Sequence, residues 1–141
     1  MNCQRIITAS AVAIAIVSVG VALQRPAISE EKASPLVYEL RTYTTHEGRL
    51  PALHKRFRDH TMKIFEKHGM KNVAYWVPAE KKDTLVYIIA HKSLKAANAS
   101  WDGFRNDPEW KAAYKASVED GKIVKKVEKQ FLTATDYSPM K

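Results

Sequence analysis

The chain has 141 residues, of which 45% are hydrophobic and 27% charged, an ordinary globular composition with room for one domain. Its formal net charge is +8, but Lys and Arg are interspersed with Asp and Glu. No zinc spacing, Gly-rich loop or recognition helix lies beside the densest basic cluster, residues 122–129. We therefore expect a solvated basic surface and no nucleic-acid partner. The single cysteine, Cys3, lies in the N-terminal segment, which excludes a disulfide or a thiol nucleophile from the domain that follows.

Residues 1–29 have the pattern of a targeting segment. Arg5 gives a short positive region, residues 6–23 carry no charge, and Ala27 and Ser29 place small side chains where a signal peptidase requires them. The apolar run is long for a signal peptide and lies at the lower edge of membrane-span length, so an uncleaved N-terminal anchor stays open. Either way we expect an exported domain, periplasmic or extracellular, that meets a membrane only through a retained N-terminal segment.

Residues 30–35 end a polar stretch bounded by prolines and indicate a linker, so the predicted domain spans residues 36–139. Residues 36–43 predict its first strand, because β-branched, aromatic and aliphatic side chains dominate them. Side chains alternate across a strand, which defines two faces. We expect the more apolar face to meet the helices; it carries Leu36, Tyr38, Leu40 and Thr42. The other face is expected to be wet or to line a polar cavity; it carries Val37, Glu39, Arg41 and Tyr43.

An amphipathic stripe predicts a helix over residues 49–67, with Gly69 as its stop. Strands are predicted over residues 72–77 and 84–91, separated by a charged hairpin loop, and the second of these is hydrophobic enough to be central. A second helical region follows, with Ser93 as its N-cap and a restart at Asp107-Pro108. Residues 126–133 predict the last strand.

The predicted order is therefore strand, helix, strand, strand, helix, strand. This is the ferredoxin-like βαββαβ arrangement of an α+β domain, in which an antiparallel four-stranded sheet takes both helices on one face. The other face of the sheet stays open and needs a cover. A second copy of the same sheet is the cover we expect.

Four stretches of the sequence, in the same order, resemble the NIPSNAP family. They are residues 38–43 (Tyr-Glu-Leu-Arg-Thr-Tyr), 48–49 (Gly-Arg), 101–110 (Trp-Asp-Gly-Phe-Arg-Asn-Asp-Pro-Glu-Trp) and 135–139 (Thr-Asp-Tyr-Ser-Pro). The resemblance implies a dimeric α/β barrel, in which two ferredoxin-like units join their open sheet faces, and therefore a homodimer. It implies no single function, because the family includes mitochondrial proteins linked to vesicle traffic and mitophagy signalling beside many bacterial proteins without an assigned role. No catalytic residues are agreed for the family, so the resemblance implies none here.

The leader departs from the mitochondrial members, since it looks secretory rather than Arg-rich and amphipathic, and this points to a bacterial exported protein. Related barrel families include cofactor-free monooxygenases and haem-degrading enzymes. That kinship is an analogy at the level of the fold.

A polar pocket is the main site hypothesis. If the face of Glu39 and Arg41 joins the face of Tyr87 and His91 on residues 84–91, the result is an aromatic-lined cavity with a carboxylate, a cation and an imidazole. Such a cavity would suit a small, partly aromatic anion, and His91 could act in it as a general base. The predicted lining is Glu39, Arg41, Tyr43, Trp76, Tyr87 and His91. The alternative is a structural Glu39–Arg41 network among core aromatics.

Other sites receive less support from the sequence. The five histidines show no metal-ligand spacing, so we expect neither a metal nor a cofactor. Trp101, Phe104 and Trp110 recur at helical spacing and are expected in the core rather than on a stacking platform. No Ser-His-Asp set, Walker loop or Rossmann glycine run occurs in the sequence.

These observations together predict an exported homodimer that binds a small molecule or a protein partner in or around the barrel. The sequence does not predict catalysis. The alternative is a cofactor-independent enzyme, monooxygenase-like or isomerase-like, that uses the barrel cavity. A membrane-tethered adaptor is a third possibility if residues 6–23 are retained.

Overall fold

The structure is a computed structural model that describes residues 36–140. The predicted leader, residues 1–29, and the predicted linker, residues 30–35, lie outside the described residues. The described elements are, in order, β1 (Val37–Thr45), α1 (Leu50–Arg56), η1 (Phe57–Thr61), α2 (Met62–Lys67), β2 (Lys71–Trp76), β3 (Thr84–His91), α3 (Leu94–Asn106), α4 (Pro108–Ser117) and β4 (Val124–Thr133). Within residues 36–140, no helix combines the length and the apolar character that a membrane crossing needs.

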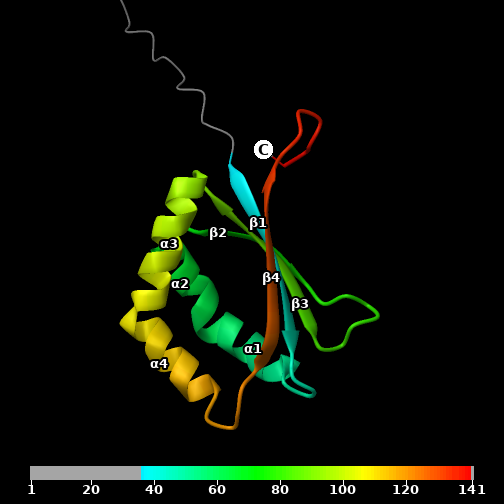
Figure 1. The fold of residues 1–141 in the computed structure, drawn as a ribbon, viewed down its shortest axis with the longest axis vertical. Helices are drawn as coiled ribbons and strands as arrows, with labels where there is room; N and C mark the ends of the chain where they lie inside the picture. Colours follow the sequence, from blue (N-terminus) through cyan, green and yellow to red (C-terminus); the bar gives the residue numbers. More distant parts are fainter. Residues whose placement is uncertain (1–35, 141) are drawn as a thin grey trace, which may run out of the picture. The chain divides into compact units, whose positions relative to one another are not determined.

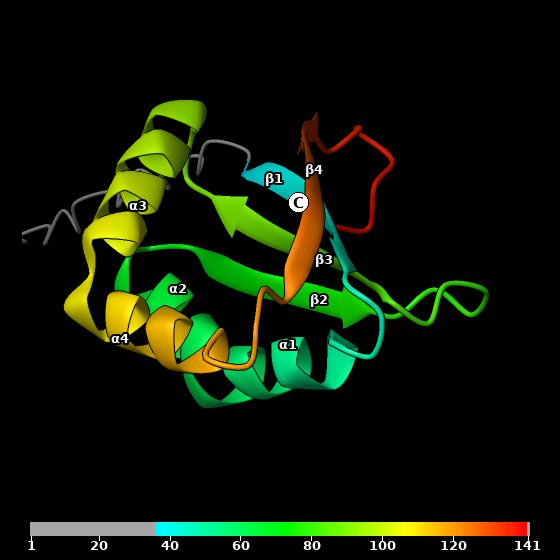
Figure 2. The same cartoon turned by 60° about the horizontal axis from the view of Figure 1, so that its bottom comes forward.

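The four strands form one antiparallel sheet in the order β2-β3-β1-β4. This order confirms the predicted ferredoxin-like fold, with the hydrophobic strand β3 in a central position. Figures 1 and 2 show α1 to α4 together on one side of the sheet, as the sequence analysis predicted. The other side of the sheet carries no helix in either view.

The first helical region confirms the predicted helix and adds a local irregularity. α1, η1 and α2 follow one another without a break, and η1 is a π-helical turn in which the Met62 N–H bonds to the Phe57 carbonyl oxygen. The Thr61 hydroxyl also donates to the carbonyl of Arg56, five residues earlier, at 3.2 Å. A π-turn inserts an extra residue into a helix, a pattern that the apolar stripe alone does not predict. Gly69, with φ 76°, ends the region as predicted.

The second helical region confirms both predicted caps. The Ser93 hydroxyl accepts a hydrogen bond from the Ala96 N–H at 3.0 Å. Asp107 caps α4, because its Oδ1 accepts from the backbone N–H groups of Glu109 and Trp110 at 2.8 and 3.2 Å. Its Oδ2 lies 2.7 Å from Nε2 of His68, so the same side chain joins the end of α2 to the start of α4.

The core lies between the sheet and the helices, and it reverses the predicted faces of β1. The alternate β3 residues Leu85, Tyr87 and Ile89 belong to the buried cluster with Phe57 and Phe65 of the helices. The register places Tyr43, Arg41 and Glu39 directly opposite those three β3 residues, and therefore on the helix-facing side. The prediction that the face of Leu36, Tyr38, Leu40 and Thr42 meets the helices is thus wrong. The open side carries the partners Leu40 and Ile88.

Strand β4 is an edge strand with little cover. It pairs with β1 alone among the strands of the described residues, and all but the first of its residues are exposed. Val127, Phe131 and Leu132 remain between 39 and 46% exposed. Three of the four lysines of the predicted basic surface, Lys125, Lys126 and Lys129, lie on this strand in exposed positions, as expected.

Candidate functional site

A buried polar cluster occupies the helix-facing side of the sheet where β1 and β3 meet. The register sets Val37 opposite His91 and Arg41 opposite Tyr87, so these β3 side chains lie on the same face as Glu39. Trp101 reaches the cluster from α3. Three elements therefore supply one site, and β1 is remote in sequence from the other two.

Glu39 is the centre of this cluster. The side chain is fully buried, and its carboxylate accepts hydrogen bonds from Arg41 Nη1 at 2.6 Å, His91 Nε2 at 3.0 Å and Trp101 Nε1 at 2.7 Å. Burial on its own would raise the pKa of Glu39, but the hydrogen bonds from His91, Trp101 and Arg41 outweigh it, so the pKa is lowered. The carboxylate is therefore ionised at neutral pH, and its donors compensate for its burial.

Arg41 is held from three sides. Besides its bond to Glu39, its Nη2 donates to the Tyr43 hydroxyl at 3.3 Å, and its guanidinium carbon lies 4.2 Å from the centre of the Trp101 ring. Burial opposes its charge, but Tyr43, Tyr87 and Glu39 outweigh burial and raise the pKa of Arg41. The Arg41 side chain is 11% exposed to solvent, whereas the side chains of Glu39 and His91 are fully buried.

Some polar atoms of the cluster have no hydrogen-bond partner. They are Nδ1 of His91, the hydroxyl of Tyr87 and Nε of Arg41. Burial raises the pKa of Tyr87, so its hydroxyl stays protonated and could donate to a ligand. His91 is oriented by Glu39 through Nε2, and its Nδ1 has no partner among the described residues. A buried polar group without a partner costs stability, and such atoms are where a ligand gains most.

Five of the six predicted pocket residues belong to this cluster: Glu39, Arg41, Tyr43, Tyr87 and His91. Trp76 does not. It pairs with Val86, on the side of the sheet away from the helices, and 50% of it is exposed. Its inclusion is wrong because a bulge between Asn72 and Ala74 shifts the alternation of β2 and places Tyr75, not Trp76, beside Tyr87.

Trp101 has a second role that its helical spacing did not predict. It packs against Phe65 and Phe104 as expected of a core residue, but its indole N–H also binds Glu39. The indole N–H could have predicted this contact, because a buried Trp N–H needs an acceptor and a buried carboxylate needs donors.

The cluster borders none of the five cavities described here. Five cavities on residues 36–140 are lined by side chains other than Arg41 and His91. Across the same part of the chain, no three His, Cys, Asp or Glu side chains converge to hold a metal ion.

The comparisons with known proteins concern the family and the fold. The NIPSNAP family model matches residues 38–139. The fold is similar to a NIPSNAP family protein of unknown function from Agrobacterium tumefaciens (24% identity, TM-score 0.67, 76% of this chain and 95% of that one). It is also similar to an uncharacterised NIPSNAP domain protein from Burkholderia xenovorans (21%, TM-score 0.63, 73% and 98%).

The fold is also similar to that of SnoaB, a cofactor-independent oxygenase from Streptomyces nogalater (15% identity, TM-score 0.55, 75% of this chain and 99% of that one). At these identities the structural likenesses establish the fold alone. No curated protein matches the chain.

Proposed function

The chain belongs to the NIPSNAP family, and from this premise we propose that it is a homodimeric binding domain that takes a small molecule or a protein partner in or around a barrel made by two open sheet faces. The observation that carries the proposal is the apolar character of the open face over β1 and β3, beside which β4 places Gln130 and Glu128. Leu40 lies directly opposite Ile88 and Thr42 opposite Val86, all four only partly buried. A sheet covered by helices on one side and apolar on the other needs a second layer.

A second copy of the chain fits this face, because it would bring the same aliphatic side chains to the other half of the barrel. The exposed Trp76 and Leu132 lie on the same side of the sheet and would extend the contact. Native mass spectrometry of the protein as isolated should report a dimer and any small molecule that stays bound.

A charge in the contact tests the dimer. Ile88→Glu should give monomers that keep their helical circular dichroism, since a carboxylate in the centre of an apolar contact has no partner. Ala99→Glu makes the same charge change at an exposed position of α3 and should leave the dimer intact. A wild-type protein that sediments as a monomer at high concentration would contradict the dimer.

For the ligand we propose a small, partly aromatic anion that binds at the buried cluster from the side of Arg41. Supporting this are the cation, the rings of Tyr43 and Trp101, and the unpaired Nδ1 of His91. A screen of small molecules on the purified protein should yield compounds that bind the wild type and lose affinity in Arg41→Ala and His91→Ala. Equal binding to all three proteins would rule out this cluster.

A cofactor-independent enzyme of oxygenase or isomerase type is the second candidate. It is favoured by the Glu39–His91 pair, which resembles the orienting carboxylate and general base of many active sites, and by the fold likeness to SnoaB. We place this candidate second because the base it would use, His91, is closed to solvent and lines none of the five cavities described above, whereas Arg41 keeps some exposure. Oxygen uptake with an aromatic substrate, lost in His91→Ala, would reverse that preference.

Export is the proposed location, supported by the charge-free run over residues 6–23 and the small residues Ala27 and Ser29. N-terminal sequencing of the protein purified from its host distinguishes cleavage after Ser29 from a retained anchor.

A further inference from the structure

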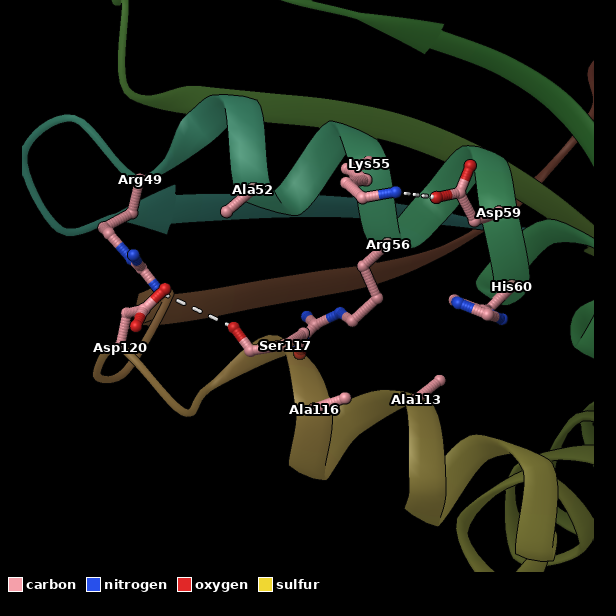
Figure 3. Close-up of a pocket in the computed structure, with 10 residues that line it drawn as sticks. All are labelled: Arg49, Ala52, Lys55, Arg56, Asp59, His60, Ala113, Ala116, Ser117 and Asp120. Atoms are coloured by element: carbon pink, nitrogen blue, oxygen red, sulfur yellow. Dashed lines mark hydrogen bonds and ion pairs between the residues drawn. The ribbon is translucent and has the colours of Figure 1, made fainter.

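A groove separates the first helical region from α4. It has a volume of about 290 Å³ and lies between α1, η1 and the C-terminal half of α4 (Figure 3). The small side chains of Ala52, Ala113 and Ala116 leave this space open. Two arginines, Arg49 and Arg56, extend from α1 and its N-cap toward the end of α4 (Figure 3). None of these residues belongs to the Glu39 cluster.

Arg56 is a buried cation without a buried anion. Only 4% of the residue is exposed, and among residues 36–140 it forms no ion pair with a carboxylate. Within the part of the chain that the structure describes, its side chain forms one hydrogen bond, from Nη1 to the Ser117 hydroxyl at 3.1 Å, and its Nε is buried without a partner. The rings of Trp110 and Tyr114, 5.2 and 5.4 Å away, compensate for only part of the lost hydration. Burial correspondingly lowers the pKa of Arg56.

Arg49 provides a second guanidinium in the same groove. Its Nη2 donates to the carbonyls of Gly121 and Ser117 at 3.0 and 3.5 Å, and its Nε is also buried without a partner. These bonds cap the carbonyl end of α4 and explain why Arg49 lies there. They do not satisfy either Nε, so two buried donors remain at one groove.

Neither carboxylate of the groove neutralises Arg56. Asp59 is bound by Lys55 at 2.5 Å. Asp120 lies beside Arg49 at one end of the groove, whereas Arg56 lies in its middle (Figure 3). Arg56 is therefore the cation in this groove that a bound anion would pair with.

We propose that this groove binds a small organic anion through a carboxylate or phosphate group, with Arg56 as the principal ligand and Arg49 as the second. Guanidinium groups match the oxygens of both anions in charge and geometry. The alanines would contact a short apolar part of the same molecule. The volume, at the lower end of the range for ligand sites, limits the ligand to a small one.

Titration of the purified, ¹⁵N-labelled protein tests the proposal with three probes: inorganic phosphate, butyrate and, as a cation of similar size, butylamine. We expect a saturable shift of the Arg56 Nε–Hε signal with at least one anion and none with butylamine. The anion that gives the shift identifies the preferred group. No saturable shift with either anion up to about 10 mM, ten times a millimolar dissociation constant, would overturn the proposal.

Two pairs of variants assign the binding to Arg56. Binding in the variants is followed by the backbone amide signals of Ala113 and Ser117, which line the groove and are kept in every variant. Arg56→Gln should weaken the binding at least about tenfold, because the hydrogen bonds from its charged group are lost. Arg58→Gln, which changes an exposed arginine on the same helical region, should change it less than about twofold. Equal affinities in these two variants would overturn the proposal.

Arg56→Gln removes a buried cation and could itself unfold the chain. The second pair of variants therefore leaves Arg56 unchanged. Ala116→Glu supplies a carboxylate within the groove. It should abolish binding of the probes and raise the melting temperature relative to Ala99→Glu, which makes the same exchange on α3. Undiminished probe binding in Ala116→Glu would place the anion elsewhere and overturn the proposal.

Discussion

Glu39 and His91 are 52 residues apart in the sequence, and their side chains meet at 3.0 Å between Oε2 and Nε2. The contact depends on the register of β1 and β3, since His91 lies opposite Val37 and Glu39 opposite Ile89, two residues along on the same face. A slip of one residue would move one partner to the other face of the sheet. The Glu39–His91 contact therefore forms only when β1 and β3 pair in the observed register.

Replacing Glu39 should destabilise the protein strongly. Glu39→Gln keeps the size of the side chain but leaves Arg41 buried without its counter-charge, which we expect to cost about 3 kcal/mol in the free energy of unfolding. Urea unfolding at neutral pH measures it. Glu47→Gln is the same exchange at an exposed position and should stay within about 0.5 kcal/mol of the wild type. Equal losses in both would show that the carboxylate is not needed.

Acid should destabilise the fold through two carboxylates. The pKa of Glu39 is lowered because donors from His91, Trp101 and Arg41 outweigh its burial, and the pKa of Asp107 is lowered by Lys67 and His68. Each contribution is complete above the pKa of the unfolded chain, about 4, and is lost as the pH falls through the folded value. Urea midpoints should therefore drop below about pH 4. The drop should be smaller in Glu39→Gln and in Asp107→Asn, and unchanged in Glu47→Gln.

The indole N–H of Trp101 should matter separately from its ring. Trp101→Phe keeps an aromatic face beside Arg41 but removes the donor to Glu39, and we expect a loss of about 2 kcal/mol. Trp110→Phe is the matched exchange, because its indole forms none of the hydrogen bonds found among residues 36–140. A larger loss in Trp110→Phe than in Trp101→Phe would argue against the hydrogen bond as the source.

Gly103 marks a close contact between α3 and the end of α2. A Cβ built on Gly103 would lie 2.6 Å from Nδ1 of His68. Gly103→Ala should cost about 2 kcal/mol by overpacking, although the exchange alone favours a helix by up to about 1 kcal/mol. In a His68→Ala background the cost should vanish or change sign, and a double-mutant cycle by thermal unfolding measures the difference. An unchanged cost would mean that His68 is not the obstacle.

The sequence predicted the fold well because its signals are local. Ser93, Asp107-Pro108 and Gly69 act on the backbone next to them, so the helix ends could be placed without knowledge of the tertiary structure. The order of the elements then leaves few ways to arrange one sheet and one helical layer.

The sequence could not show which face of β1 is buried. Alternation groups Glu39 with Arg41 and Tyr43, but it does not say on which side the helices lie. The polar side chains of Glu39 and Arg41 suggested that their face is turned away from the helices. In the structure this face is the inner one, because the ion pair and the indole of Trp101 compensate for the burial of the charges. That compensation comes from three separate elements, and the bulge that turns Trp76 outward likewise depends on pairing with β3.

The exposed edge of β4 has a consequence for how copies of the chain avoid one another. A free strand with half-exposed Val127, Phe131 and Leu132 would offer a template on which further strands could add without end. The lysines at 125, 126 and 129 oppose this, because a second strand laid alongside would bring like charges together. Part of the chain's positive charge thus protects it from aggregation.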